Sequence, residues 1–178
     1  MAMSLAGKTP FVRAAAFLSY NPKGMLGPVF HDFKYHGFRH LARYMRTLAA
    51  TDPGMRSFFD GVDFLLPVPM HPWKQLRRGY NQAAEIASGI GEEMNIPVGN
   101  CLTAISRHRT QTGMTAEQRA RNISGIFRYR PHDDMLGKHI CIVDDVCTTG
   151  ATMLSCAEAI RQTDPSASLI FFSIGYTQ

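Results

Sequence analysis

The stretch at residues 139–163 constrains the fold more than any other part of the sequence. A strand is predicted at 139–146, where an apolar run at 140–143 leads into two aspartates. A turn of threonines and small residues follows this strand. The next residues, 150–163, place apolar side chains at helical spacing: Met153, Leu154, Ala157 and Ile160. A buried strand that passes through a tight turn into an amphipathic helix is typical of an α/β protein with a parallel sheet.

Other segments continue this alternation of strands and helices. Apolar runs at 62–68 and 169–174 predict two more buried strands, and weaker strands are predicted at 98–105 and 126–129. A helix is predicted at 81–94, with one apolar face formed by Ala83, Ile86, Ala87 and Ile90. The pattern predicts a central, mainly parallel sheet flanked by helices, and such sheets bind ligands at the carboxyl ends of their strands.

The first third of the chain predicts a small helical extension. Apolar residues recur at roughly helical spacing between Val29 and Leu48, and a turn at 51–54 closes that run. We therefore expect an N-terminal extension at residues 1–60 and a main domain at residues 61–178.

Composition limits the kinds of partner. The formal net charge of +5 over 178 residues favours acidic partners such as phosphates, nucleotides or nucleic acid, without choosing among them. The four cysteines form no CxxC pair, which argues against a zinc site and for reduced thiols in a cytoplasmic protein. Arg13 interrupts the mildly apolar first twenty residues and no cleavage site follows, so we expect no signal peptide. No apolar run is long enough to predict a membrane span.

The turn after residue 145 has the composition of a phosphate-binding site. A turn and the start of a helix expose backbone N–H groups, and these favour a phosphate group. Thr148, Thr149 and Thr152 add hydroxyl donors. Gly150 and Ala151 have small side chains, so the backbone there can approach a ligand closely.

The two aspartates before this turn suit a different part of a ligand. A phosphate would be repelled by Asp144 and Asp145, whereas sugar hydroxyls or a hard cation such as Mg²⁺ would be bound by them. A strand ending in two acids also occurs in P-loop nucleotidases, but the sequence lacks their GxxxxGK[ST] loop. One of the aspartates could instead serve only as a structural cap.

This stretch resembles the signature of the type I phosphoribosyltransferases. That signature has four apolar residues, two acids, two variable positions, two threonines and a small-residue turn, although Ala151 stands where many members have a second glycine. The resemblance implies that Asp144 and Asp145 are catalytic and hold Mg²⁺. It also implies a binding site for 5-phosphoribosyl-1-pyrophosphate (PRPP) formed by Asp144, Asp145, Val146, Cys147, Thr148, Thr149, Gly150, Ala151 and Thr152.

Two further segments resemble the ComF/GntX family. Residues 67–82 match its pattern of a PVP strand end, a basic loop and an RG-aromatic-NQ helix start, which implies pyrophosphate binding by Arg77, Arg78 and Gly79. Residues 106–127 match a second basic pattern, which in type I relatives is a flap over the substrate. Catalytic contacts to the departing pyrophosphate are thereby implied for Arg107 and Arg109. A surface loop or a nucleic-acid contact are the alternatives for this segment.

The resemblance extends from about residue 20 to the C-terminus and implies a type I phosphoribosyltransferase fold with a small N-terminal hood-like extension. It implies an enzyme that uses PRPP and Mg²⁺, with a nucleobase as one acceptor, in natural competence or DNA uptake. The alternative is a non-catalytic, PRPP-binding regulatory or DNA-uptake accessory protein that contacts single-stranded DNA. The cysteine-rich zinc ribbon usual in the family is absent from this sequence. Neither the acceptor nor the choice between monomer and dimer follows from the sequence.

Overall fold

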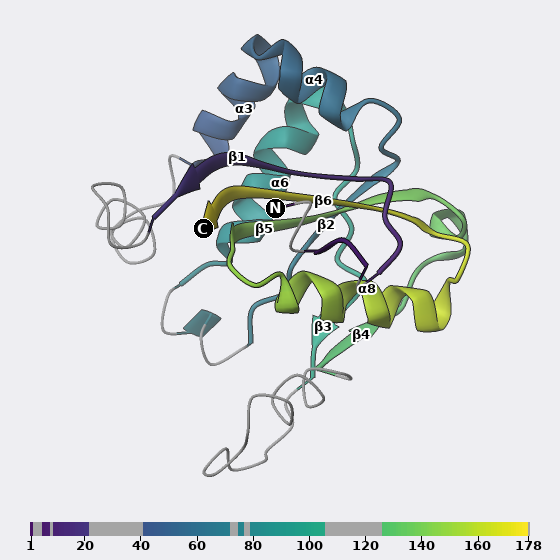
Figure 1. Cartoon of the computed structure of the whole chain (residues 1–178). Helices are drawn as coiled ribbons and strands as arrows, with labels where there is room; N and C mark the ends of the chain where they lie inside the picture. The colour runs from purple at the N-terminus through teal and green to yellow at the C-terminus, as the bar shows by residue number, and fades with distance from the viewer. Residues whose placement is uncertain are drawn as a thin grey trace.

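The centre of the molecule is a four-stranded parallel sheet (Figure 1). The computed structural model describes residues 1, 5–7, 9–21, 41–71, 75–76, 79–105 and 126–177. In spatial order, the strands are β1 (Arg13–Tyr20), β6 (Ser168–Thr177), β5 (His139–Cys147) and β2 (Phe64–Pro67). The parallel sheet predicted from the sequence is therefore confirmed.

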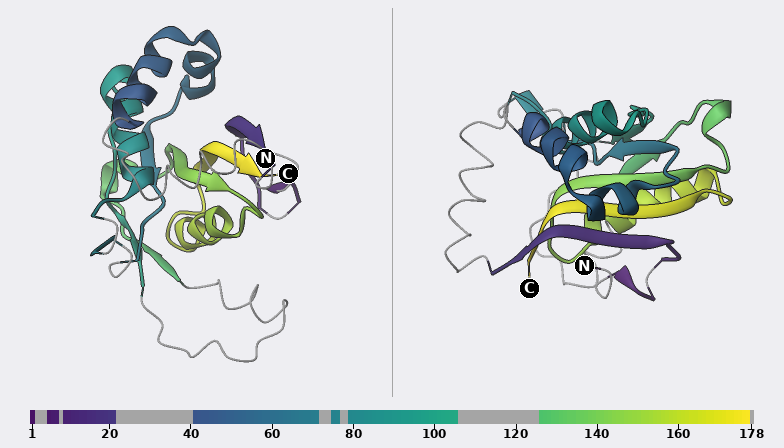
Figure 2. Two further views of the ribbon diagram at one scale, coloured as in Figure 1. Left: turned by 90° about the vertical axis from the view of Figure 1, so that its left-hand side faces the viewer. Right: turned by 90° about the horizontal axis from the view of Figure 1, so that it is seen from above.

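Helices cover both faces of the sheet (Figures 1 and 2). On one face lie α3 (Leu41–Thr51), α4 (Pro53–Phe59) and α6 (Gln82–Met94), and on the other lies α8 (Ala151–Thr163). Successive strand residues face opposite ways, so Phe171 packs in the α8-side core and Phe172 in the α6-side core. The predicted helical faces on α6 and α8 are directed into these two cores.

A short antiparallel pair lies beside α8, outside the main sheet. It consists of β3 (Leu102–Ala104) and β4 (Phe127–Tyr129), followed by a 3₁₀ turn at Asp133–Met135. The strand predicted at 98–105 is thus shorter than expected, and its first part makes only an isolated bridge between Val98 and Leu65.

The N-terminal third differs most from the prediction. Residues 13–20 form β1, which pairs in parallel with β6 near the other end of the chain, and no strand was predicted there. The turn predicted at 51–54 also begins α4, because Asp52 caps this helix by accepting a hydrogen bond from the Met55 amide at 3.0 Å, and Pro53 starts it. The division at residue 60 stays a prediction, although the central sheet draws strands from both sides of it.

Two expectations about the chain as a whole can be compared with the structure. All four cysteines are buried, and none of them forms a disulfide. In the described part of the chain, none of the helices combines the length and apolar character that crossing a bilayer requires.

Candidate functional site

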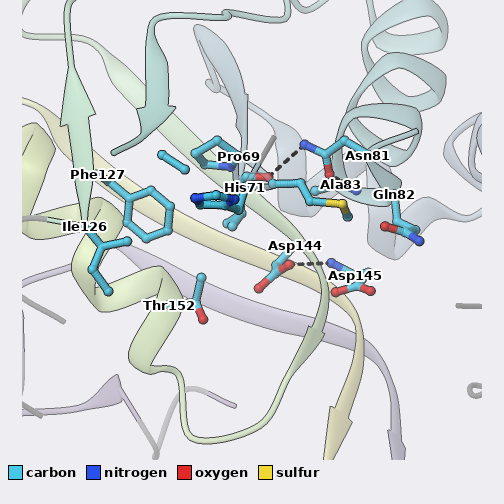
Figure 3. Close-up of a pocket in the computed structure, with 13 residues that line it drawn as sticks. Pro69, His71, Asn81, Gln82, Ala83, Ile126, Phe127, Asp144, Asp145 and Thr152 are labelled. Atoms are coloured by element: carbon cyan, nitrogen blue, oxygen red, sulfur yellow. Dashed lines mark hydrogen bonds between the residues drawn. The ribbon is translucent and has the colours of Figure 1, made fainter. Parts of the chain in front are cut away.

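A hollow of about 290 Å³ opens at the carboxyl ends of β2 and β5 (Figure 3). Its walls come from the residues after β2, the end of β5, the first turns of α6 and α8, and the β3–β4 pair. This is the edge of the sheet at which the sequence predicted a ligand site. The hollow therefore brings together segments that are far apart in the chain.

Asp144 and Asp145 lie at the end of β5 and both line the hollow. The Asp145 amide donates to Asp144 Oδ1 at 2.9 Å, and the Val146 amide donates to Asp145 Oδ1 at 2.7 Å, so the backbone orients both half-buried carboxylates. Figure 3 shows Asp144 on the side of Thr152 and Asp145 on the side of Gln82. The pair thus presents negative charge to both halves of the hollow.

The turn into α8 leaves the start of this helix without a side-chain cap. Gly150 occupies the cap position in the left-handed conformation, with φ +77°, and no side chain caps the helix from there. Thr149 Oγ1 accepts a long hydrogen bond of 3.4 Å from the Ala151 amide, and Thr148 and Thr149 are both exposed. Uncapped amides at a helix start attract anions, as predicted for this turn.

Gly150 also has a packing reason that the sequence did not reveal. A Cβ atom at this position would lie 2.5 Å from Leu5 Cδ2, which is too close for two non-bonded carbon atoms, so Leu5 would have to move. Leu5 is fully buried, so this residue near the N-terminus packs against the turn at Gly150. Cys147, one of the predicted PRPP-binding residues, has its side chain buried beside this contact, which leaves its backbone as the part that can meet a ligand.

The opposite wall is formed by the start of α6. The Asn81 side chain caps this helix by accepting from the Ala83 amide at 3.1 Å, and its Nδ2 donates to the Val68 carbonyl at 3.0 Å. The next residue, Gln82, is only 1% exposed, and neither atom of its amide head has a hydrogen-bond partner in the described structure.

Gln82 received no role from the sequence, although a signal was present. It lies four and eight residues before Ile86 and Ile90, and it therefore occupies the buried stripe of α6. A polar residue on an apolar stripe next to a predicted site marks a side chain that serves a ligand or a buried contact.

All four arginines predicted to bind pyrophosphate lie outside the described part of the chain: Arg77, Arg78, Arg107 and Arg109. Gly79 is described and has φ +83°, in agreement with the tight turn predicted for it. On either side of residues 106–125, the amide of Ile105 donates to the carbonyl of Ile126 at 2.6 Å, and Ala104 and Ile126 line the hollow. The described residues that flank the predicted flap therefore lie at the hollow, while the segment itself falls outside the described part of the chain.

Burial and the charge of Asp144 affect the pKa of a cysteine in the adjacent core. Burial raises the pKa of the Cys156 thiol, and the negative charge of Asp144 raises it further. Burial likewise raises the pKa of Cys141 and of Cys101. These thiols therefore stay protonated and take no part in ionic binding at neutral pH.

The carboxylate pair fits Mg²⁺ that arrives with a phosphorylated ligand. Among the described residues no group of three or more His, Cys, Asp or Glu side chains forms a metal cage. Mg²⁺ is commonly held by one or two carboxylates together with waters and substrate phosphates. Asp144 and Asp145 would supply such a partial set of oxygen ligands, and the start of α8, which lacks a side-chain cap, follows them in the chain.

Sequence comparison assigns the class of protein. The family model described as "Phosphoribosyl transferase domain" matches residues 76–174, more than half of the chain. The chain belongs to this phosphoribosyltransferase family, and the α/β fold described above is the fold predicted for it.

Curated relatives place the chain with the ComF-type members of that family. It is 30% identical to Competence protein F of Haemophilus influenzae over 126 residues, which cover 70% of this chain and 55% of that protein. It is 26% identical to DNA utilization protein YhgH of Escherichia coli K12 over 164 residues, which cover 89% of this chain and 70% of that protein. The chain thus spans little more than half the length of Competence protein F.

Sequence identity to a protein of solved structure is lower than to these relatives. Adenine phosphoribosyltransferase from Leishmania tarentolae aligns with a TM-score of 0.49 and 10% identity, over 89% of this chain and 90% of that one.

Proposed function

We propose that this protein binds PRPP together with Mg²⁺ and transfers its phosphoribosyl group to a nitrogen acceptor such as a nucleobase. The observation that carries this proposal is that Asp144 and Asp145 line one hollow together with Thr152, which lies in the first turn of α8, a helix whose start has no side-chain cap. One part suits a sugar diol and the other a phosphate dianion, and PRPP carries both groups on one ribose.

Each part of the site has a separate task in this proposal. The 5′-phosphate lies against the first amides of α8, with the hydroxyls of Thr148 and Thr149 beside it. Asp144 and Asp145 accept hydrogen bonds from the ribose hydroxyls. Arg77 and Arg78 receive the pyrophosphate, and their planar guanidinium groups suit its oxygens.

The reaction exchanges one bond at C1 of the ribose for another. The C1–O bond to pyrophosphate breaks, and the leaving group keeps the electron pair. The acceptor nitrogen forms a bond to C1 and loses a proton. When bound, Mg²⁺ neutralises charge on the pyrophosphate, while the carboxylates stabilise the positive charge that develops on the ribose. Arg107 and Arg109 contribute positive charge to the departing group.

Calorimetric titration of PRPP with and without Mg²⁺ tests the proposal. Asp145→Asn is expected to keep the fold and to abolish measurable binding, because it removes charge from the diol and metal side of the hollow. Asp134→Asn provides a matched control, since Asp134 is an exposed acid outside the hollow. An affinity in Asp145→Asn equal to that of the wild type refutes the assignment.

Turnover is tested separately by pyrophosphate release against a panel of purine and pyrimidine bases. Removal of one preorganised electrostatic contact typically lowers such a rate by about 10²–10³. Asp145→Asn should show at least this loss with any base that supports release in the wild type.

A second function is favoured by the names of the relatives, Competence protein F and DNA utilization protein YhgH. In this alternative the chain binds PRPP without turnover and contacts single-stranded DNA during DNA uptake. The net charge of +5 is compatible with such a contact. PRPP binding without pyrophosphate release on any base, together with oligonucleotide binding that weakens steeply with salt, would favour it.

A further inference from the structure

The Gln82 side chain is a buried polar group of the hollow that the proposed chemistry does not yet use. It is 1% exposed, it lines the hollow, and both Nε2 and Oε1 lack hydrogen-bond partners among the described residues. Such a group loses its hydrogen bonds to water and gains nothing in return, so it destabilises the unliganded protein. A contact to a bound ligand would restore those bonds.

A structural role for Gln82 is already filled by its neighbour. Asn81 caps α6 and ties it to the segment after β2 through the Val68 carbonyl. The apolar contacts of the same helix face come from Ile86 and Ile90, which are fully buried. The amide of Gln82 therefore adds nothing to the folded chain that an apolar side chain of equal length would not supply.

The position of Gln82 indicates which part of a ligand it meets. Figure 3 shows its amide head on the Asp145 side of the hollow, whereas Thr152 and the start of α8 lie on the Asp144 side. If the 5′-phosphate of a ribose lies on α8 and its diol on the aspartates, C1 points toward α6. The amide NH₂ of Gln82 is then a hydrogen-bond donor for an anionic group on C1.

We propose that Gln82 binds the diphosphate on C1 and thereby makes the site distinguish PRPP from ribose 5-phosphate, an inference that rests on the proposed function. A buried polar group left unpaired penalises any ligand that lacks the matching group. Ribose 5-phosphate carries no anionic group on C1, whereas PRPP and inorganic pyrophosphate offer charged acceptor oxygens to the Gln82 NH₂ group. Gln82 is thus a specificity residue for the group on C1.

The test compares Gln82→Met with the wild type in the presence of Mg²⁺. Methionine keeps the length of the side chain and removes the amide. We expect the dissociation constants for PRPP and for inorganic pyrophosphate to rise about tenfold, as loss of one hydrogen bond to a charged group predicts. The dissociation constant for ribose 5-phosphate should stay unchanged. Gln162→Met, the same change at an exposed position on α8, is the control and should alter none of the three.

Stability without ligand gives an independent readout. Removal of an unpartnered buried amide should leave the thermal midpoint of Gln82→Met equal to or above that of the wild type. A clear fall in the midpoint would show that the amide has a structural partner and would overturn the proposal.

The binding data separate the failure of this inference from failure of the proposed function. If Gln82→Met weakens the binding of PRPP and ribose 5-phosphate equally, or weakens neither, the proposed role of Gln82 is wrong. The proposal that the wild-type protein binds PRPP is not contradicted by either result. A wild-type protein that binds neither PRPP nor pyrophosphate overturns both.

Discussion

The helices α6 and α8 begin beside the same hollow, yet only α6 caps its own start. Asn81 satisfies the Ala83 amide at 3.1 Å, whereas Gly150 offers α8 no side-chain acceptor and Thr149 offers only a long contact of 3.4 Å. A capped helix has already used one of its free amides, and an uncapped helix keeps its amides for a ligand. The difference suits α8 for anion binding and α6 for support.

The contrast is reversed for the polar side chains in the first turn of each helix that line the hollow. Gln82 on α6 is buried with an unpartnered amide, while Thr152 on α8 is exposed. In the proposed function, α8 therefore recognises its ligand through the backbone and α6 recognises it through a side chain. Changes in backbone conformation should weaken ligand binding on the α8 side of the hollow, and changes in side-chain chemistry should weaken it on the α6 side.

The largest effect is expected from Gly150→Ala, which disturbs the backbone conformation at the start of α8. Alanine in the left-handed conformation costs about 1–2 kcal/mol, and displacement of Leu5 adds about 1–3 kcal/mol to the loss of unfolding free energy. PRPP affinity should fall at least tenfold, because the first amides of α8 shift. Chemical denaturation and calorimetry measure the two losses.

Gly61→Ala is the control for this prediction. Gly61 has φ +70°, and a Cβ there would meet nothing within 4 Å. The control should lose only the conformational part, about 1–2 kcal/mol, and should bind PRPP normally. If Gly150→Ala loses no more stability than Gly61→Ala, the contact with Leu5 does not restrict this turn.

An intermediate effect is expected from Asn81→Ala, which removes the cap of α6. Loss of the cap and of the bond to the Val68 carbonyl should lower the free energy of unfolding by about 1–2 kcal/mol. Urea denaturation measures this loss, and the exposed Asn100→Ala is the control. Equal stability of the two variants would show that α6 does not depend on its own cap.

The smallest effect is expected from Thr149→Ala. Its contact with the Ala151 amide is long and exposed, so the unfolding free energy should fall by less than about 0.5 kcal/mol. Affinity should weaken by the same few-fold factor for PRPP and ribose 5-phosphate, because both carry the 5′-phosphate. This pattern is the opposite of that expected for Gln82→Met.

Thr163→Ala, at the exposed far end of α8, is the control for this prediction. If Thr149→Ala lost PRPP binding but kept ribose 5-phosphate binding, the placement of the 5′-phosphate at the start of α8 would be wrong.

The part of the site formed by β5 and α8 could largely be predicted from the sequence, because the residues that form it are consecutive in the chain. The apolar run of β5, the two acids and the turn are consecutive, and the helix that follows has a clear apolar face. The helix α6 was predicted, but the burial of the Gln82 amide without a partner was not. Its burial depends on what packs over the first turn of α6, which helical periodicity alone does not give.

The first strand shows the limit of local patterns most clearly. β1 contains three consecutive alanines and does not alternate apolar and polar residues, so its sequence carries little strand signal. Its partner β6 lies at the other end of the chain, with Arg13 opposite Ile170. Only long-range pairing makes this segment a strand.

The sequence by itself determined the order of strands and helices from residue 61 onward, the position of the acidic strand end and the phosphoribosyltransferase class. These properties depend on spacing and residue type within short segments. The tertiary structure alone decided that β1 joins the sheet, that Leu5 lies against Gly150, and that the Gln82 amide is buried without a partner. Each of these features requires contact between distant segments, and such contacts form only when the hydrophobic cores on both faces of the sheet are packed.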